Sequence, residues 1–158
     1  MALVIEDGSG KEGAESYATV AEYVAYHEKM GNDVSGQSEA DQEAALRKAA
    51  QYMHRYSWKG ERVYERQSLD WPRAWVEAND HPIRQDVVPE RVKDAQAELA
   101  LRVINNGELL ADLDRNIQSA SLGPMSVTYA SGSREQTQFA AVTNLVRPYI
   151  HTGTKLVR

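Results

Sequence analysis

The sequence contains no cysteine, which excludes disulfide bonds and thiolate metal sites. It has one phenylalanine against eight tyrosines and three tryptophans, so most aromatic rings carry a polar group suited to half-buried sites and interfaces. No apolar stretch approaches the roughly 20 residues of a membrane-spanning helix, and the apolar run at the N-terminus is too short for a secretory signal peptide. We therefore expect a protein assembled in a reducing cytoplasm, without a membrane partner.

The motifs that usually mark an active site are also missing. None of the four histidines belongs to an HExxH or similarly spaced metal set, and no GxSxG, GxxxxGK[ST] or GxGxxG sequence occurs. His27 falls on the apolar stripe of an expected helix, where a packed and hydrogen-bonded core histidine is the simplest interpretation. The sequence thus predicts no catalytic residue, no metal site and no cofactor.

Acidic residues outnumber basic ones, 23 to 18, and the charges are unevenly distributed along the chain. The formal net charge is -5, which argues against a general nucleic-acid-coating protein, since such proteins bind mainly by neutralising phosphates. The last 23 residues hold three cations and no acid, so they carry +3, while the first 135 residues, with 15 cations and 23 acids, carry -8. A basic segment on an acidic body is either a solvated terminus or a docking arm.

We interpret the C-terminal segment from about Arg147 to Arg158 as a docking arm that contacts a partner protein or a neighbouring subunit. Pro148 and Gly153 discourage a long helix there, so the segment is expected to be extended. The residues expected to make these contacts are Arg147, His151, Lys155, Leu156, Val157 and Arg158.

Helical periodicity predicts a mainly α fold, a bundle of about four helices with a small β-hairpin and extended termini. The four helices are expected to run from Thr19 to Gly31, from Ser38 to before Gly60, from Pro89 to Gly107, and from about Phe139 to near Pro148. Alternation of apolar and polar residues predicts the hairpin within residues 117–129, with its turn at 122–124. We expect one helical domain over residues 1–150, with an extended N-terminal arm at 1–15, and a flexible tail at 151–158.

A long segment without periodicity, residues 57–88, contains all three tryptophans. Its central motif consists of Gln67, Leu69, Trp71, Pro72, Arg73 and Trp75. In the favoured interpretation this is a structural loop: Trp71 and Trp75 fill the gap between the helices, and the nearby arginines face solvent or a neighbouring subunit. In the alternative, bases of single-stranded nucleic acid stack on Trp71 and Trp75 beside four cations, namely Lys59, Arg62, Arg66 and Arg73.

Five segments in this order resemble a phage and prophage family often labelled DnaT-like single-stranded DNA-binding protein. The segments are Glu6-Asp7-Gly8 with Ser16-Tyr17; Ala45-Leu46 and Ala49 with Trp58-Lys59-Gly60; Gln67, Leu69 and Trp71-Pro72-Arg73; Val88-Pro89 with Ala95 and Glu98-Leu99-Ala100; and Val127-Thr128-Tyr129. The likeness covers nearly the whole chain, and Trp71-Pro72-Arg73 is its most specific part. Members also look similar to the helical head–tail connector (adaptor) subunits of tailed bacteriophages.

The resemblance implies a structural connector that forms a ring, expected to be a dodecamer, in the virion neck. Its implied partners are further copies of itself, the portal protein, a tail or second connector (terminator) protein, and the DNA passing through the channel. An acidic channel would repel the phosphates of that DNA, which agrees with the negative net charge. The alternative function is that of a DnaT-like accessory protein that binds single-stranded DNA.

Overall fold

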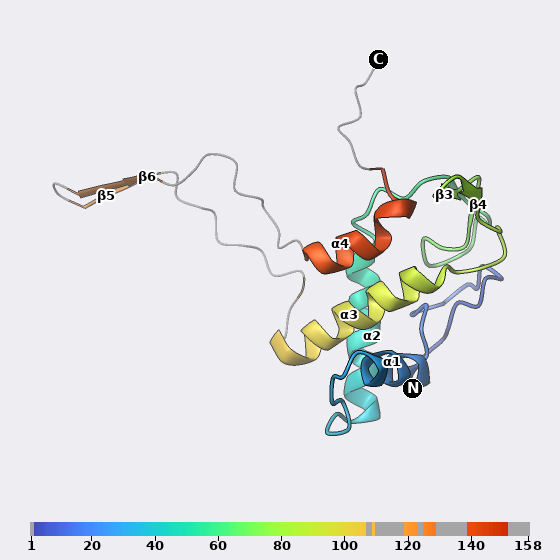
Figure 1. The fold of residues 1–158 in the computed structure, drawn as a ribbon, viewed down its shortest axis with the longest axis horizontal. Helices are drawn as coiled ribbons and strands as arrows, with labels where there is room; N and C mark the ends of the chain where they lie inside the picture. The colour runs from blue at the N-terminus through green and yellow to red at the C-terminus, as the bar shows by residue number, and fades with distance from the viewer. Residues whose placement is uncertain (1, 107–108, 110–118, 123–124, 129–138, 152–158) are drawn as a thin grey trace, which may run out of the picture.

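The computed structural model describes residues 2–106, 109, 119–122, 125–128 and 139–151. This part of the chain is mainly helical, as predicted, and adds three two-stranded antiparallel sheets to four α-helices (Figure 1). The helices are α1 (Val20–Lys29), α2 (Glu39–Met53), α3 (Glu90–Asn106) and α4 (Ala140–Val146), followed by a 3-10 turn, η1 (Arg147–Tyr149). The sheets pair β1 (Glu61–Arg62) with β2 (Arg73–Ala74), β3 (Glu77–Ala78) with β4 (His81–Pro82), and β5 (Ser119–Leu122) with β6 (Met125–Thr128).

The first two helices begin at side-chain caps. The Thr19 hydroxyl accepts a hydrogen bond from the backbone N–H of Glu22 (3.0 Å), and the Glu22 carboxylate accepts one from the backbone N–H of Thr19 (2.7 Å). At α2, the Ser38 hydroxyl accepts from the backbone N–H of Asp41 (3.2 Å). These bonds satisfy N–H groups that have no partner within the helix, so the predicted helix starts are confirmed.

The core lies where α3 packs against α2 and α4 (Figure 1). On α3, Val92 and Leu99 are completely buried, and on α2 the small side chains of Ala45 and Ala49 let the helices approach closely. Burial of these stripes, rather than intrinsic helix propensity, supplies most of the stability of such helices.

A buried glutamine in α3 connects three segments. The Gln96 carbonyl oxygen accepts hydrogen bonds from the backbone N–H groups of Tyr17 (2.9 Å) and Ala18 (3.0 Å). Its amide nitrogen donates to the Ser16 hydroxyl (2.8 Å) and to the Leu46 carbonyl (2.9 Å). Because every polar atom of this buried side chain is bonded, Gln96 fixes the chain before α1 against α2 and α3.

His27 also lies within the core, as predicted. Its side chain is fully buried, with Nε2 3.0 Å from the Ala97 carbonyl oxygen and Nδ1 3.1 Å from the Asn32 amide nitrogen. Both ring nitrogens therefore have partners inside the fold, and the prediction of a packed, hydrogen-bonded core histidine is confirmed.

The hairpin predicted within residues 117–129 is present as β5 and β6, with Leu122 opposite Met125 and Ser119 opposite Thr128. Its predicted turn lies partly outside the described residues. The last helix begins after Phe139, which is its N-cap, as expected from the sequence.

Candidate functional site

The segment between α2 and α3 is organised around Trp71, whose side chain is completely buried. Its ring meets the rings of Trp58 and Tyr149 edge to face, at centroid distances of 5.9 and 5.7 Å. The Tyr17 hydroxyl accepts hydrogen bonds from the backbone N–H groups of Asp70 (3.0 Å) and Trp71 (3.4 Å), and burial raises the pKa of that hydroxyl. The peptide bond from Trp71 to Pro72 is cis.

Gln67 supplies hydrogen bonds that this irregular backbone cannot make with itself. Its buried amide nitrogen donates to the carbonyls of Leu69 (2.9 Å) and Pro72 (3.1 Å), and its amide oxygen accepts from the backbone N–H of Tyr64 (3.0 Å). One side chain thus satisfies three backbone groups in a segment with little regular structure.

Arg73 has the same kind of role on the other side of Trp71. Its guanidinium donates to the carbonyls of Lys59 (2.7 Å), Gly60 (2.7 Å) and Asp70 (3.2 Å), and burial lowers its pKa. Arg62 likewise donates to two loop carbonyls. The prediction that the arginines face solvent or a neighbour is therefore wrong for Arg73, which is buried because the loop carbonyls need donors and a guanidinium carries five. Arg62 stays exposed, as predicted, although its guanidinium also bonds to the loop.

Trp75 departs from the prediction that it fills the gap between the helices. Its side chain is 85% exposed, whereas the next residue, Val76, is 1% exposed. The backbone of Trp75 has a φ of 59°, in the left-handed region that non-glycine residues rarely adopt. Trp75 lies between β2 and β3, and its left-handed backbone turns the indole outward while the Val76 side chain enters the core. The prediction is therefore wrong for Trp75.

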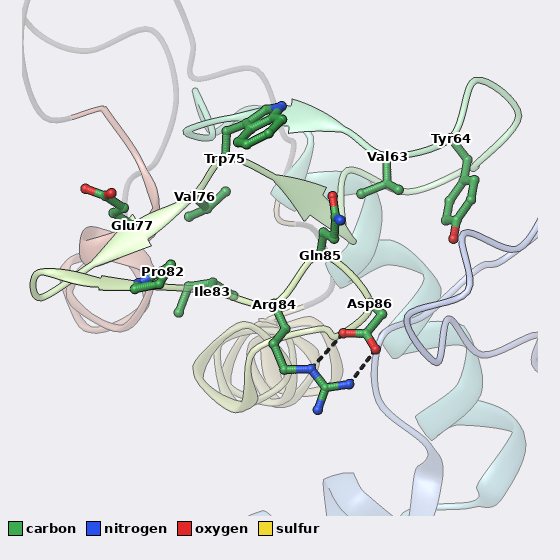
Figure 2. A pocket seen from close by; sticks show the side chains of 10 residues that line it. All are labelled: Val63, Tyr64, Trp75, Val76, Glu77, Pro82, Ile83, Arg84, Gln85 and Asp86. Carbon is green, nitrogen blue, oxygen red and sulfur yellow. Dashed lines mark hydrogen bonds and ion pairs between the residues drawn. The ribbon is translucent and has the colours of Figure 1, made fainter.

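The exposed indole lies at a surface pocket of about 890 Å³ (Figure 2). The ten residues that line it are Val63, Tyr64, Trp75, Val76, Glu77, Pro82, Ile83, Arg84, Gln85 and Asp86. Figure 2 shows Trp75 and the Arg84–Asp86 pair on opposite sides of the pocket, with Tyr64 at one end beside the N-terminal segment. The pocket therefore offers two exposed aromatic rings, since Tyr64 is 46% exposed.

Arg84 is the only cation among the ten described residues that line the pocket, and Glu77 and Asp86 are acidic. The Arg84 Nε donates to Asp86 Oδ1 (2.9 Å), and Nη2 donates to Oδ2 of the same carboxylate. This bidentate pairing raises the pKa of Arg84 and lowers that of Asp86. Both side chains are mostly exposed, at 75% and 57%, so the pair is solvated.

The N-terminal loop, residues 6–11, packs against two segments that line the pocket, and it folds around a buried carboxylate. Glu6 is fully buried and accepts hydrogen bonds from the backbone N–H groups of Gly8 (2.8 Å), Gly10 (2.8 Å) and Lys11 (2.7 Å). A Cβ at Gly8 would lie 2.1 Å from a backbone oxygen, that of Asp86. The loop therefore contacts the chain segment that carries the pocket's charged pair.

Gly10 makes the corresponding contact at the other end of the pocket. A Cβ at this position would lie 2.1 Å from the ring of Tyr64, and the backbone φ of +71° also favours glycine. The tyrosine ring thus rests directly on the Gly10 backbone, which fixes one of the two exposed aromatic side chains.

The predicted C-terminal contact residues are only partly described. Arg147 begins the 3-10 turn η1, and both Arg147 and His151 have exposed side chains. Ile150 is buried and forms a β-bridge with Trp58, and the His151 backbone N–H donates to the Ser57 carbonyl (2.9 Å). Residues 147–151 therefore belong to the folded body, and the prediction of an extended arm is wrong for them, because apolar Tyr149 and Ile150 pack inward. The remaining four, Lys155, Leu156, Val157 and Arg158, lie outside the described residues.

Chemically, the pocket combines flat aromatic rings, an apolar wall and one guanidinium. Planar rings can stack on exposed tryptophan and tyrosine, and a guanidinium can pair with an anion. Within the described ranges, no group of three or more histidine, cysteine, aspartate or glutamate side chains could hold a metal ion. No helix in that part of the chain is long and apolar enough to cross a membrane.

Sequence reasoning did not find Tyr64, Arg84 or Asp86. They carry no periodic signal, and an arginine two residues from an aspartate is common on protein surfaces. The signal that could have been followed was Trp75, which the favoured interpretation placed between the helices and the alternative interpretation made a stacking surface.

Comparison with known families assigns the whole chain. A family model with the description "Putative DnaT-like ssDNA binding protein" matches residues 1–158. No curated protein and no solved structure matches the chain. The matching family is not a head–tail connector family, so the assignment of this chain to the phage connector (adaptor) family is wrong. That assignment relied on the likeness of family members to connector subunits and on the acidic net charge, and an acidic net charge is equally typical of helical proteins outside a virion.

Proposed function

This chain belongs to the DnaT-like ssDNA binding protein family, and from that membership we propose that it is an accessory protein that binds single-stranded DNA, with Trp75 as the surface on which a base stacks. The observation that carries the proposal is the 85% exposure of Trp75 at the edge of a pocket. An indole on the surface contributes little to the protein's own core, and it offers a flat face to any base.

The surroundings of Trp75 support this role. The pocket volume of about 890 Å³ falls within the range of small-molecule and cofactor sites. Tyr64 supplies a second exposed ring, and Val63 and Ile83 line the same pocket. A strand could therefore stack a base on Trp75 while a neighbouring base contacts the tyrosine.

The electrostatics predict weak binding. The net charge is -5, and Arg84 is the only cation among the ten described lining residues. Few counterions would be released from the DNA, so we expect a shallow dependence of affinity on salt and a dissociation constant above about 1 μM at ~0.15 M salt. Stacking, rather than phosphate neutralisation, supplies most of the affinity in this proposal.

The test is a Trp75→Ala variant titrated against a short fluorescein-labelled oligothymidylate by fluorescence anisotropy. Loss of one base–aromatic stack, about 1–3 kcal/mol, should weaken binding roughly fivefold or more, and Trp75→Phe should recover part of it. Met30→Ala is the matched control, because Met30 is also exposed (57%) and does not line the pocket. Equal affinities of Trp75→Ala and the original protein would contradict the proposal.

Intrinsic fluorescence gives an independent readout. Trp58 and Trp71 are buried, at 6% and 0% exposure, so quenching by added DNA should come from Trp75. We expect the quenching to disappear in Trp75→Ala and to persist in Met30→Ala.

The absence of catalytic activity and of a cofactor stays a prediction. The ring-shaped homo-oligomer, the portal and tail partners and the virion location were implied by the connector resemblance, and the family found here does not add support for them.

A further inference from the structure

The Arg84–Asp86 pair lies in the same pocket as Trp75, and neither side chain bonds to any other residue in the part of the chain that the structure describes. The Arg84 guanidinium donates two hydrogen bonds to the Asp86 carboxylate, and the two side chains are 75% and 57% exposed to solvent. Exposed ion pairs of this kind contribute little to stability. A pair that is weak and accessible can exchange one partner for another at low cost.

The pocket's charge makes such an exchange relevant to DNA. With Glu77 and Asp86 against Arg84, the three charged lining side chains sum to -1, which disfavours a polyanion. A guanidinium presents the same two parallel N–H donors to a carboxylate and to a phosphate. Asp86 therefore occupies the donors that a DNA phosphate would use.

We infer that Arg84 receives a backbone phosphate of the strand whose base stacks on Trp75, and that Asp86 competes with this phosphate for the guanidinium and so limits affinity. This inference rests on the proposed function and deepens it, because it assigns the phosphate contact and its competitor. Asp86 is thus a specificity-determining residue that keeps the site from holding any anion tightly and leaves selection to the base on Trp75.

The position of the pair supports this assignment. Figure 2 shows Trp75 at the top of the pocket and the Arg84–Asp86 pair at the bottom, with Gln85 between them, so a strand that crosses the pocket from Trp75 would bring a backbone phosphate to Arg84. The Asp86 backbone is held by contact with Gly8, while the Asp86 side chain stays solvated. The carboxylate can therefore leave the guanidinium without disturbing the loop behind it.

A double-mutant cycle tests the exchange, with anisotropy of the same oligothymidylate as the readout. Asp86→Asn should tighten binding roughly threefold to fivefold, the size of one exposed ion pair, and Arg84→Ala should weaken binding by a similar factor. In the Arg84→Ala background, Asp86→Asn should have almost no effect, since no guanidinium is left to release. Glu77→Gln is the matched control, because it removes a carboxylate from the same pocket that is not paired with Arg84.

The possible results separate the exchange from the proposed function. Two results would attribute the effect to the general loss of negative charge: Asp86→Asn strengthens binding equally with and without Arg84, or it strengthens binding no more than Glu77→Gln does. The proposed exchange would then be wrong, and the proposed DNA binding would be unaffected. If no variant binds the oligothymidylate, the proposed function fails and the exchange fails with it. An oligomer with uncharged methylphosphonate linkages adds a further requirement: its binding must be insensitive to both substitutions.

Discussion

Trp71 and Trp75 lie in the same irregular segment, close together in the sequence, and have opposite environments. Trp71 is fully buried between Trp58 and Tyr149, whereas Trp75 is 85% exposed at the edge of a pocket. The two tryptophans differ in backbone conformation. Trp75 adopts a left-handed conformation, so its side chain points outward and the side chain of Val76 is buried instead. In a segment without periodicity, residue type alone does not decide which aromatic ring enters the core.

The hydrogen bonds of the segment follow the same division. Gln67, Arg62 and Arg73 bond to backbone carbonyls around Trp71. On the other side of the segment, the guanidinium of Arg84 is paired only with an exposed carboxylate. The Trp71 region is therefore built for stability, and the Trp75 region has solvated groups that can meet a ligand.

Trp71→Ala is the substitution expected to lower the free energy of unfolding most. Removing a completely buried indole leaves a large cavity, so we expect the free energy of unfolding to fall by about 3–5 kcal/mol. Urea denaturation followed by circular dichroism measures this directly. A loss below about 1 kcal/mol would mean that the core closes around the missing ring.

Arg73→Ala comes next in size. The substitution removes three hydrogen bonds and leaves loop carbonyls without donors, so we expect a loss of about 2–4 kcal/mol in the free energy of unfolding. Arg66→Ala is the control, because the Arg66 side chain is 83% exposed, and its denaturation midpoint should match that of the original protein. Equal stability of the two variants would show that water replaces the guanidinium.

The helices could be predicted because their signals are local. The capping box of Thr19 and Glu22 and the cap at Ser38 mark helix starts by side-chain chemistry that depends on neighbours a few residues away. His27 could be placed in the core because its position on an apolar stripe follows from the helical period.

The site could not be predicted in the same way, because its geometry depends on contacts between distant segments. Gly10 meets Tyr64, and Gly8 meets the backbone of Asp86, across long sequence separations. The positive φ of Trp75 has no sequence signature, since glycine and asparagine, not tryptophan, are the residues that favour it. The lack of periodicity and the three tryptophans thus identified the segment but left the orientation of Trp75 undetermined.

Gly10→Ala disturbs the pocket indirectly, through the contact between Gly10 and the Tyr64 ring. The new Cβ must displace the Tyr64 ring, and the left-handed backbone adds strain, so we expect a loss of about 1–2 kcal/mol in unfolding free energy together with weaker DNA binding. Gly13→Ala is a matched control, because Gly13 also has a positive φ (79°) but nothing lies within 4 Å of its Cβ position. If both variants bind DNA equally well, the contact with Tyr64 does not support the site.

The smallest expected effect on stability is that of Trp75→Ala, and it completes the comparison with Trp71→Ala. An indole that is 85% exposed gives up little buried area when it is removed, so the free energy of unfolding should change by less than about 0.5 kcal/mol. Replacing the left-handed Trp75 with alanine keeps a Cβ at that position, so the backbone strain is nearly unchanged. Urea denaturation of both tryptophan variants in one experiment decides the matter. A loss for Trp75→Ala close to that of Trp71→Ala would place both rings in the core and remove the structural basis for a stacking surface. An unchanged midpoint, together with weakened oligothymidylate binding, would separate the residue that holds the loop from the residue that contacts DNA.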